Sequence, residues 1–179
     1  KIAHTGGYNM ADEYINKIER FGHWKDTALM LEGPAVDTFL VLFLQMWTYS
    51  HELLDVTSYM VEHEGFDTPG FVVPYGDNPL DKDKVGENVY IDILNHARDF
   101  VHIMTPYLIL DGELLHALKF AAERGVDVSI IMPGIPDKKS AYYLAKTYYP
   151  TLLASGVKIY EYTPGFIHAK VFVSDNSRA

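Results

Sequence analysis

The region after residue 86 alternates between helical and strand patterns, and this alternation constrains the fold more than any other feature. Apolar residues recur at helical spacing over residues 87–98, 112–124 and 140–155, the last interrupted at Pro150. Short apolar, β-branched runs fall between and after them, over residues 100–104, 126–132, 157–160 and 167–174. Strands that alternate with helices predict an α/β fold with a mostly parallel mixed sheet flanked by helices.

The first 65 residues show a different set of patterns. We expect strands over residues 1–3 and 27–32, a helix over residues 11–20, and a strongly amphipathic helix after Gly33-Pro34. That helix carries apolar residues from Val36 to Trp47 and fits either core packing or contact with a membrane interface. A polar, turn-rich segment over residues 62–70 indicates a boundary, followed by a strand over residues 71–74. We therefore divide the chain into residues 1–65 and 66–179.

Composition excludes several classes of function. The formal net charge of −9 argues against broad nucleic-acid binding, which depends on basic patches. The absence of cysteine excludes disulfides, thiolate chemistry and most structural zinc sites. No pair among the seven histidines other than His168 has the spacing of metal ligands. The longest apolar run, residues 39–47, is too short to span a bilayer. We expect no metal and no cofactor.

One short stretch carries most of the chemical information. His168 and Lys170 lie two residues apart in an apolar run, and Asp175 follows five residues after the lysine. Residues i and i+2 of a strand share a face, so an imidazole and an ammonium would lie side by side. Two such groups are costly to desolvate together, and an anion or phosphate bound between them would offset that cost. The alternative is a solvated pair of charges on a surface strand.

The spacing His168-x-Lys170-x-x-x-x-Asp175 matches the HxKxxxxD signature of the phospholipase D superfamily. The segment Gly6-Gly7-Tyr8-Asn9 resembles the stretch that follows such a signature, and the run from Trp24 to Asp26 resembles the Trp-x-Asp that comes after it. The run over residues 160–170, YEYTPGFIHAK, resembles the second signature of bacterial cardiolipin synthases. The resemblance covers almost the whole chain, from the end of a first domain of this kind, residues 1–65, into a second, residues 66–179.

The resemblance implies phosphodiester chemistry in two steps through a phosphohistidine. It implies His168 as the general acid and base, with Lys170 and Asn9 holding phosphate oxygens. Gly7 and Thr105 are further candidates for substrate contact, and Thr105 ends a strand where ligands bind in parallel sheets. By the same resemblance, Asp26 would orient the histidine of the first signature, and Asp175 would mostly support its strand. No metal or cofactor is implied.

Cardiolipin synthases transfer a phosphatidyl group from one phosphatidylglycerol to another. The resemblance therefore implies a phospholipid substrate and a longer protein at the bacterial cytoplasmic membrane, of which this chain would be a soluble internal part. The chain starts at Lys1 and ends soon after Asp175. We expect it to be inactive alone, since the route needs a second histidine. The patterns leave the oligomeric state open.

Two alternatives stay open. The parent protein could be another phosphodiesterase of the superfamily, such as a phosphatidylserine synthase, a phospholipase D or a nuclease. It could also be a catalytically silent binding module that keeps the fold.

Overall fold

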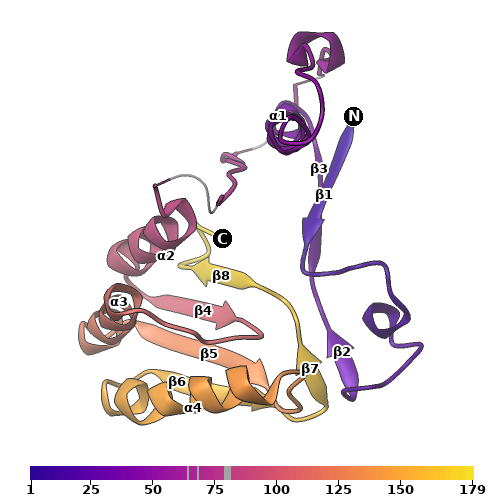
Figure 1. Cartoon of the computed structure of the whole chain (residues 1–179). Helices are drawn as coiled ribbons and strands as arrows, with labels where there is room; N and C mark the ends of the chain where they lie inside the picture. The colour runs from indigo at the N-terminus through magenta and orange to yellow at the C-terminus, as the bar shows by residue number, and fades with distance from the viewer. Residues whose placement is uncertain (64, 68, 79–81) are drawn as a thin grey trace. The chain divides into compact units, whose positions relative to one another are not determined.

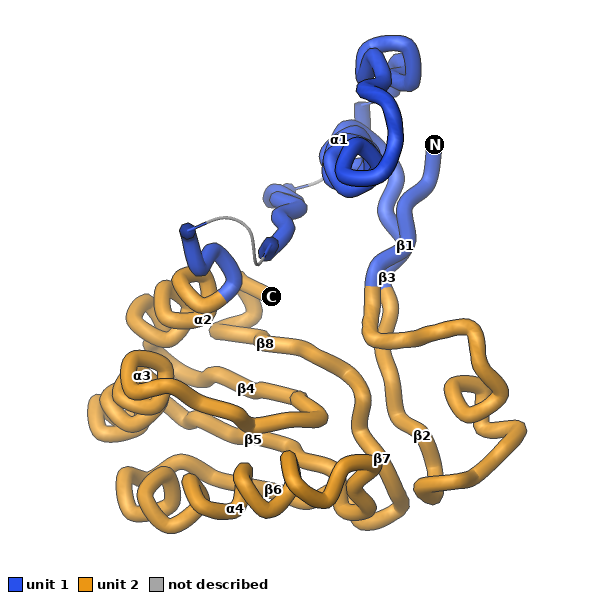
Figure 2. The backbone as a smooth tube through the Cα atoms, viewed as in Figure 1, with its two compact units in different colours: residues 1–5, 29–86 blue, residues 6–28, 87–179 orange. Residues whose placement is uncertain are grey.

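The computed structural model describes residues 1–63, 65–67, 69–78 and 82–179, and the chain divides into two compact units. Unit 1 contains residues 1–5 and 29–86, and unit 2 contains residues 6–28 and 87–179 (Figure 2). By compactness, residues 6–28 therefore join the C-terminal part of the chain. The assignment of residues 1–65 and 66–179 to two phospholipase D-like domains stays a prediction.

A four-stranded sheet forms the centre of unit 2 (Figure 1). Its strands lie in the order β6-β5-β4-β8, with bounds β4 Phe100–Met104, β5 Asp127–Pro133, β6 Lys158–Tyr162 and β8 Val171–Ser174. The first three pair in parallel, and β8 pairs antiparallel to β4. This arrangement confirms the predicted mixed, mostly parallel sheet.

Alternate residues of the central strands build the hydrophobic core. Val101 and Ile103 of β4 and Val128 and Ile130 of β5 are almost completely buried, whereas their neighbours along each strand are more exposed. The buried residues pack against three helices, α2 Val85–His96, α3 Gly112–Glu123 and α4 Lys139–Ala154. One apolar face and one more polar face is the pattern expected of strands whose side chains alternate.

A second, two-stranded sheet joins distant parts of unit 2. Strand β2 (His23–Lys25) pairs in parallel with β7 (Gly165–Ile167), so that Trp24 lies opposite Phe166. Gly165 allows this approach, because a Cβ there would collide with the backbone of His23. A short 3-10 helix, η1 (Asp12–Ile15), precedes β2. This pairing brings the chain before residue 28 to the segment that carries His168.

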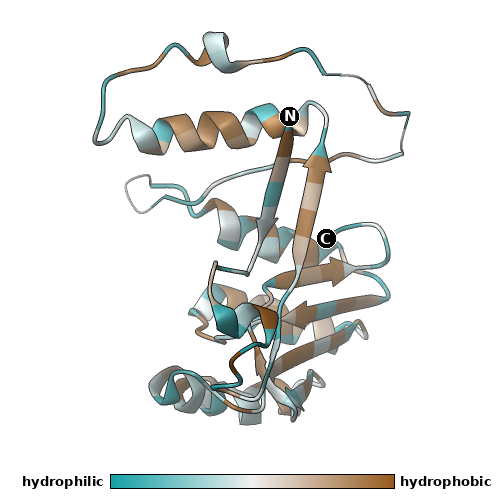
Figure 3. Cartoon of the chain, turned by 90° about the vertical axis from the view of Figure 1, so that its right-hand side faces the viewer, coloured by the Kyte–Doolittle hydropathy of each residue, from teal (hydrophilic) through white to brown (hydrophobic). Residues whose placement is uncertain are grey.

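Unit 1 contains most of the β1–β3 pair, helix α1 and the short 3-10 helix η2. Their bounds are β1 Ile2–Gly6, β3 Ala28–Glu32, α1 Ala35–Trp47 and η2 Val56–Tyr59. Apolar residues run along α1 (Figure 3). Only Val36 and Leu44 of this helix are buried, whereas Phe43 is 57% exposed. Of the two alternatives for this stripe, core packing therefore holds for only part of it.

Several predicted elements need correction. Residues 71–74 are not a strand, and the helix expected over residues 11–20 is reduced to η1. The helix expected to break at Pro150 continues through it. The single strand expected over residues 167–174 is two strands, β7 and β8, because residues 168–170 leave the ladder between them. Within the described residues, no helix combines the length and apolarity needed to cross a bilayer.

Candidate active site

His168 stands where the chain leaves β7. Its backbone N–H donates to the carbonyl of Lys25 at 2.8 Å, which prolongs the β2–β7 pairing by one residue. Its Nδ1 lies 3.0 Å from Oδ2 of Asp26, and the two side chains are only 16% and 8% exposed. A carboxylate can only accept, so Nδ1 carries the proton in this contact and Nε2 keeps the lone pair. The contact therefore fixes both the ring and the nitrogen that can react.

Asp26 is held by its own neighbours. Its Oδ1 accepts from the backbone N–H of Thr27 at 2.8 Å, and Trp24 packs its ring 5.4 Å from that of His168. The Trp24 ring also lies 4.8 Å from Phe166. The sequence resemblance paired Asp26 with a different histidine. The structure corrects this expectation, because the β2–β7 register carries Asp26 to His168.

Lys170 closes on the same histidine. Its Nζ lies 2.7 Å from the backbone oxygen of His168 and 2.9 Å from Nε2 of the ring. Burial lowers the pKa of Lys170 below its usual value, and the nearby carboxylates of Asp26 and Asp137 act in the opposite direction. The ammonium thus lies beside the reactive nitrogen, where the oxygens of a bound phosphate would replace imidazole as its partner.

His168, Asp26 and Lys170 form a cluster of side chains, here called the His168 cluster, and Gly7 and Asn9 contact it in different ways. A Cβ on Gly7 would collide with Oδ1 of Asp26 and the backbone oxygen of His168, so this position admits the carboxylate only because it has no side chain. The Nδ2 of Asn9 donates to the hydroxyl of Tyr14 at 2.8 Å. Tyr14 in turn lies edge-on to His168, with ring centroids 5.4 Å apart. Asn9 is therefore linked to His168 through a tyrosine.

Asp175 and Thr105 occupy other positions. The carboxylate of Asp175 accepts from the backbone N–H groups of Arg98, Asp99 and Phe100, at the start of β4. These bonds, with that to Phe100 foremost, lower the pKa of Asp175. The structure therefore does not bring this residue to His168. Thr105 follows the opposite end of β4, where its hydroxyl donates to the carbonyl of Tyr107 and its side chain lines a cavity with Lys170.

Two residues near His168 and Lys170, Tyr14 and Asp137, carried no signal in the sequence, whereas Tyr107 follows Thr105 in the Thr-Pro-Tyr run that the sequence marked as a candidate pocket wall. The hydroxyl of Tyr107 donates to Oδ2 of Asp137 at 2.6 Å, and burial raises the pKa of that hydroxyl well above its usual range. The other oxygen of Asp137 is buried without a hydrogen-bond partner. A tyrosine after a Thr-Pro pair at the end of a predicted strand was the one available hint for Tyr107.

Among the described residues, one group of acidic side chains lies close enough to share a metal ion. It consists of Glu87, Asp111 and Glu113 on α2 and at the start of α3, and two of the three are exposed. Asp111 is already engaged as the N-cap of α3, where its side chain accepts from Leu114. The group does not include any residue of the His168 cluster.

Comparison with known proteins places the chain in one family. Residues 90–179 match the family described as "Cardiolipin synthase, PLD-like domain". An uncharacterized protein of Streptococcus mutans is 64% identical and matches 100% of this chain and 39% of its own length. Cardiolipin synthase 2 of Bacillus anthracis is 40% identical over 98% of this chain and 34% of that protein. A cardiolipin synthase of Clostridium perfringens is 37% identical over 99% of this chain and 38% of that protein. The chain thus spans between a third and two fifths of the length of these relatives.

Proposed function

This chain belongs to the cardiolipin synthase family of phospholipase D-like domains, and on that basis we propose that it forms part of a phosphatidyltransferase. The reaction joins two molecules of phosphatidylglycerol into cardiolipin and releases glycerol. Two relatives that align with nearly the whole chain are named cardiolipin synthases, which supports this choice within the superfamily. The formal charge of −9 argues against a nucleic-acid substrate.

The contact between His168 and Asp26 carries the proposal. In the proposed route, a histidine outside this chain attacks phosphorus and the bond to the glycerol oxygen breaks. His168 enters this step as the imidazolium, gives its Nε2 proton to that departing oxygen and is left neutral, with the Nδ1 proton still hydrogen-bonded to Asp26. It then takes a proton from the hydroxyl of the second phosphatidylglycerol, whose oxygen attacks phosphorus and releases the histidine. Asp26 holds the ring through Nδ1 during both transfers and stabilises the imidazolium.

Lys170 has an electrostatic role in this scheme. A lysine is a compact positive charge suited to non-bridging phosphate oxygens. Its Nζ lies 2.9 Å from Nε2 of His168, so an oxygen bound to it would also lie near the reacting nitrogen. Asn9 would add a neutral donor, either directly after it releases Tyr14 or through the tyrosine hydroxyl.

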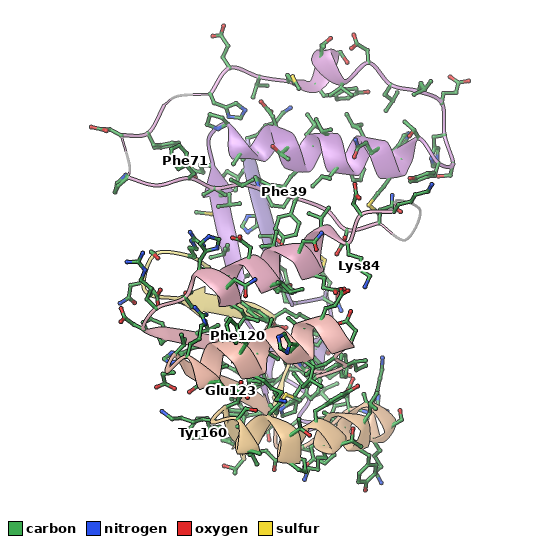
Figure 4. The ribbon with its side chains drawn as sticks, turned by 90° about the vertical axis from the view of Figure 1, so that its left-hand side faces the viewer. Phe39, Phe71, Lys84, Phe120, Glu123 and Tyr160 are labelled. Atoms are coloured by element: carbon green, nitrogen blue, oxygen red, sulfur yellow. The ribbon has the colours of Figure 1, made fainter. Side chains whose placement is uncertain are left out.

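The test uses a protein that contains this chain with the flanking sequence of its gene. Incubated with labelled phosphatidylglycerol, it should yield cardiolipin and glycerol in equal amounts, and His168→Ala should abolish both. His116→Ala is the matched control, because His116 is exposed on α3 and stacks on Phe120, which also belongs to α3 (Figure 4). It should retain activity.

Other products would contradict the proposal. Phosphatidic acid without cardiolipin would indicate a hydrolase, and cleaved DNA would indicate a nuclease. Binding of lipid with no product would indicate a silent module. We also expect the 179-residue chain by itself to be inactive, since its sequence holds one HxKxxxxD signature and the route needs two histidines.

A further inference from the structure

A cavity of about 180 Å³ lies next to the His168 cluster in unit 2. Its walls come from the end of β4, the loop over residues 105–110, one side of α3, and Phe172 of β8. Phe172 is held in place by Tyr90 of α2, because the two rings stack 4.3 Å apart and 12° from parallel. The cavity therefore lies between secondary-structure elements that fix its shape.

The chemistry of the walls is that of a site for a hydrocarbon chain with an anionic end. Leu108, Leu114 and Leu118 contribute aliphatic surface. Among the residues that line the cavity, all of them in the described part of the chain, Lys170 alone is charged. A cavity left by imperfect packing would have no reason to include this ammonium, which also contacts His168 at 2.7 Å.

We propose that this cavity binds the start of an acyl chain of the phospholipid whose phosphodiester lies on Lys170 and His168. The inference rests on the proposed function, because it takes a phosphodiester at these two residues as its starting point. It adds a subsite that anchors the donor lipid through its apolar part. An ammonium group beside an aliphatic interior matches an amphiphile with phosphate at one end, and matches neither a sugar nor a peptide.

The experiment measures binding of alkyl phosphates to the 179-residue chain by calorimetry, in a series from ethyl to decyl phosphate below their micelle concentrations. Each methylene that enters the cavity should improve the affinity about fourfold, the factor that corresponds to burial of one CH₂ group. The gain should stop when the cavity is full. Inorganic phosphate and the matching alkyl alcohols should bind much more weakly than the longer alkyl phosphates.

Variants of α3 locate the site. Leu114→Phe reduces the cavity and should end the gain at a shorter chain, whereas Leu114→Ala enlarges it and should extend the gain to a longer one. Leu115→Phe is the matched control: Leu115 is also partly buried on α3 but does not line the cavity, so its series should follow that of the wild type. Thermal melting verifies that each variant is folded, and the opposite shifts of the two Leu114 variants cannot both arise from misfolding.

The outcomes separate this inference from the proposed function. Affinity that is independent of chain length, but is lost in Lys170→Met, would overturn the acyl subsite and leave a phosphate site at Lys170. A chain-length gain that is unaffected by both Leu114 variants would also overturn it, since the hydrocarbon would then bind elsewhere. Failure of phosphatidyl transfer in the lipid assay, with a chain-length gain that moves with Leu114, would leave the subsite and remove the proposed reaction.

Discussion

Replacing Gly7 by alanine tests whether the contact between Asp26 and His168 depends on close backbone packing. The φ angle of Gly7 lies outside the left-handed region, so alanine meets no conformational penalty there. Its Cβ, however, would collide with Oδ1 of Asp26 and the backbone oxygen of His168. Neither group can simply rotate away, because the carboxylate is bound to Thr27 at 2.8 Å and the oxygen belongs to the main chain.

The structure allows two responses to the added methyl group. If Asp26 stays, the overpacked contact costs about 1–3 kcal/mol. If Asp26 moves, it gives up hydrogen bonds that involve a charged group, each worth about 1.5–3 kcal/mol. The smaller of the two costs decides the outcome, and we expect the free energy of unfolding of unit 2 to fall by about 2 kcal/mol.

Urea unfolding of the 179-residue chain measures this change. Trp24 is 8% exposed and belongs to unit 2, whereas the other tryptophan, Trp47, belongs to unit 1. In a Trp47→Phe background, the fluorescence of Trp24 therefore reports on unit 2. With an m-value of about 1–3 kcal/mol/M, the midpoint of Gly7→Ala should fall by about 1 M.

Gly112→Ala is the matched control. Gly112 is the first residue of α3, and a Cβ there meets nothing within 4 Å. Alanine should stabilise the helix by about 0.5–1 kcal/mol. If Gly7→Ala were neutral or stabilising like the control, the close packing of Gly7 against Asp26 would be refuted as a determinant of this site.

Three further substitutions test neighbouring parts of the site. Asp26→Asn keeps the shape of the side chain but removes the charge opposite His168. The kcat for phosphatidyl transfer should therefore fall about 10- to 100-fold with KM little changed. An unchanged kcat would contradict the role of Asp26. The pKa of Asp175 is lowered in the folded state, so its stabilisation is complete above the ordinary value of 3.8 and is lost as pH falls toward the folded pKa. Urea unfolding at a series of pH values should therefore show a weaker acid dependence for Asp175→Asn than for the wild type. Tyr107→Phe should lower the free energy of unfolding by about 1–3 kcal/mol in the same assay, because Asp137 loses its partner, and combining it with Asp137→Leu should recover much of that loss.

The sequence predicted the parts of the fold that depend on local periodicity. The strand over residues 100–104 and the helix that begins at Gly112 lie where the pattern placed them, and Gly125 ends the turn after that helix with φ of +94°. The prediction of a strand over residues 71–74 was wrong, because an apolar, β-branched run forms a strand only when it pairs with a neighbouring strand. Phe71 of this run is 99% exposed (Figure 4).

The site could be predicted only in part. His168 and Lys170 follow a fixed local spacing and were recognised from it. The partner of Asp26 could not be read in this way, because it depends on the register that pairs Trp24 with Phe166 across 142 residues. The contact between Tyr107 and Asp137 was missed for the same reason, since nothing in the sequence indicates that a hydroxyl and a carboxylate 30 residues apart will meet.

The pairing of β2 with β7 also has a consequence for how the molecule assembles. Residues 29–86 form most of unit 1, and they connect the two stretches of sequence that make up unit 2. For the folding of unit 2, this segment is therefore a long loop that the β2–β7 pairing closes. Loop closure costs only about 0.6 kcal/mol more for each doubling of loop length, so changes in the length of this segment should affect stability little. Contacts so distant in sequence do, however, slow folding. During synthesis, Asp26 must wait for another 142 residues before its partner His168 is made, so this contact forms later than the local hydrogen bonds of the helices and turns between them.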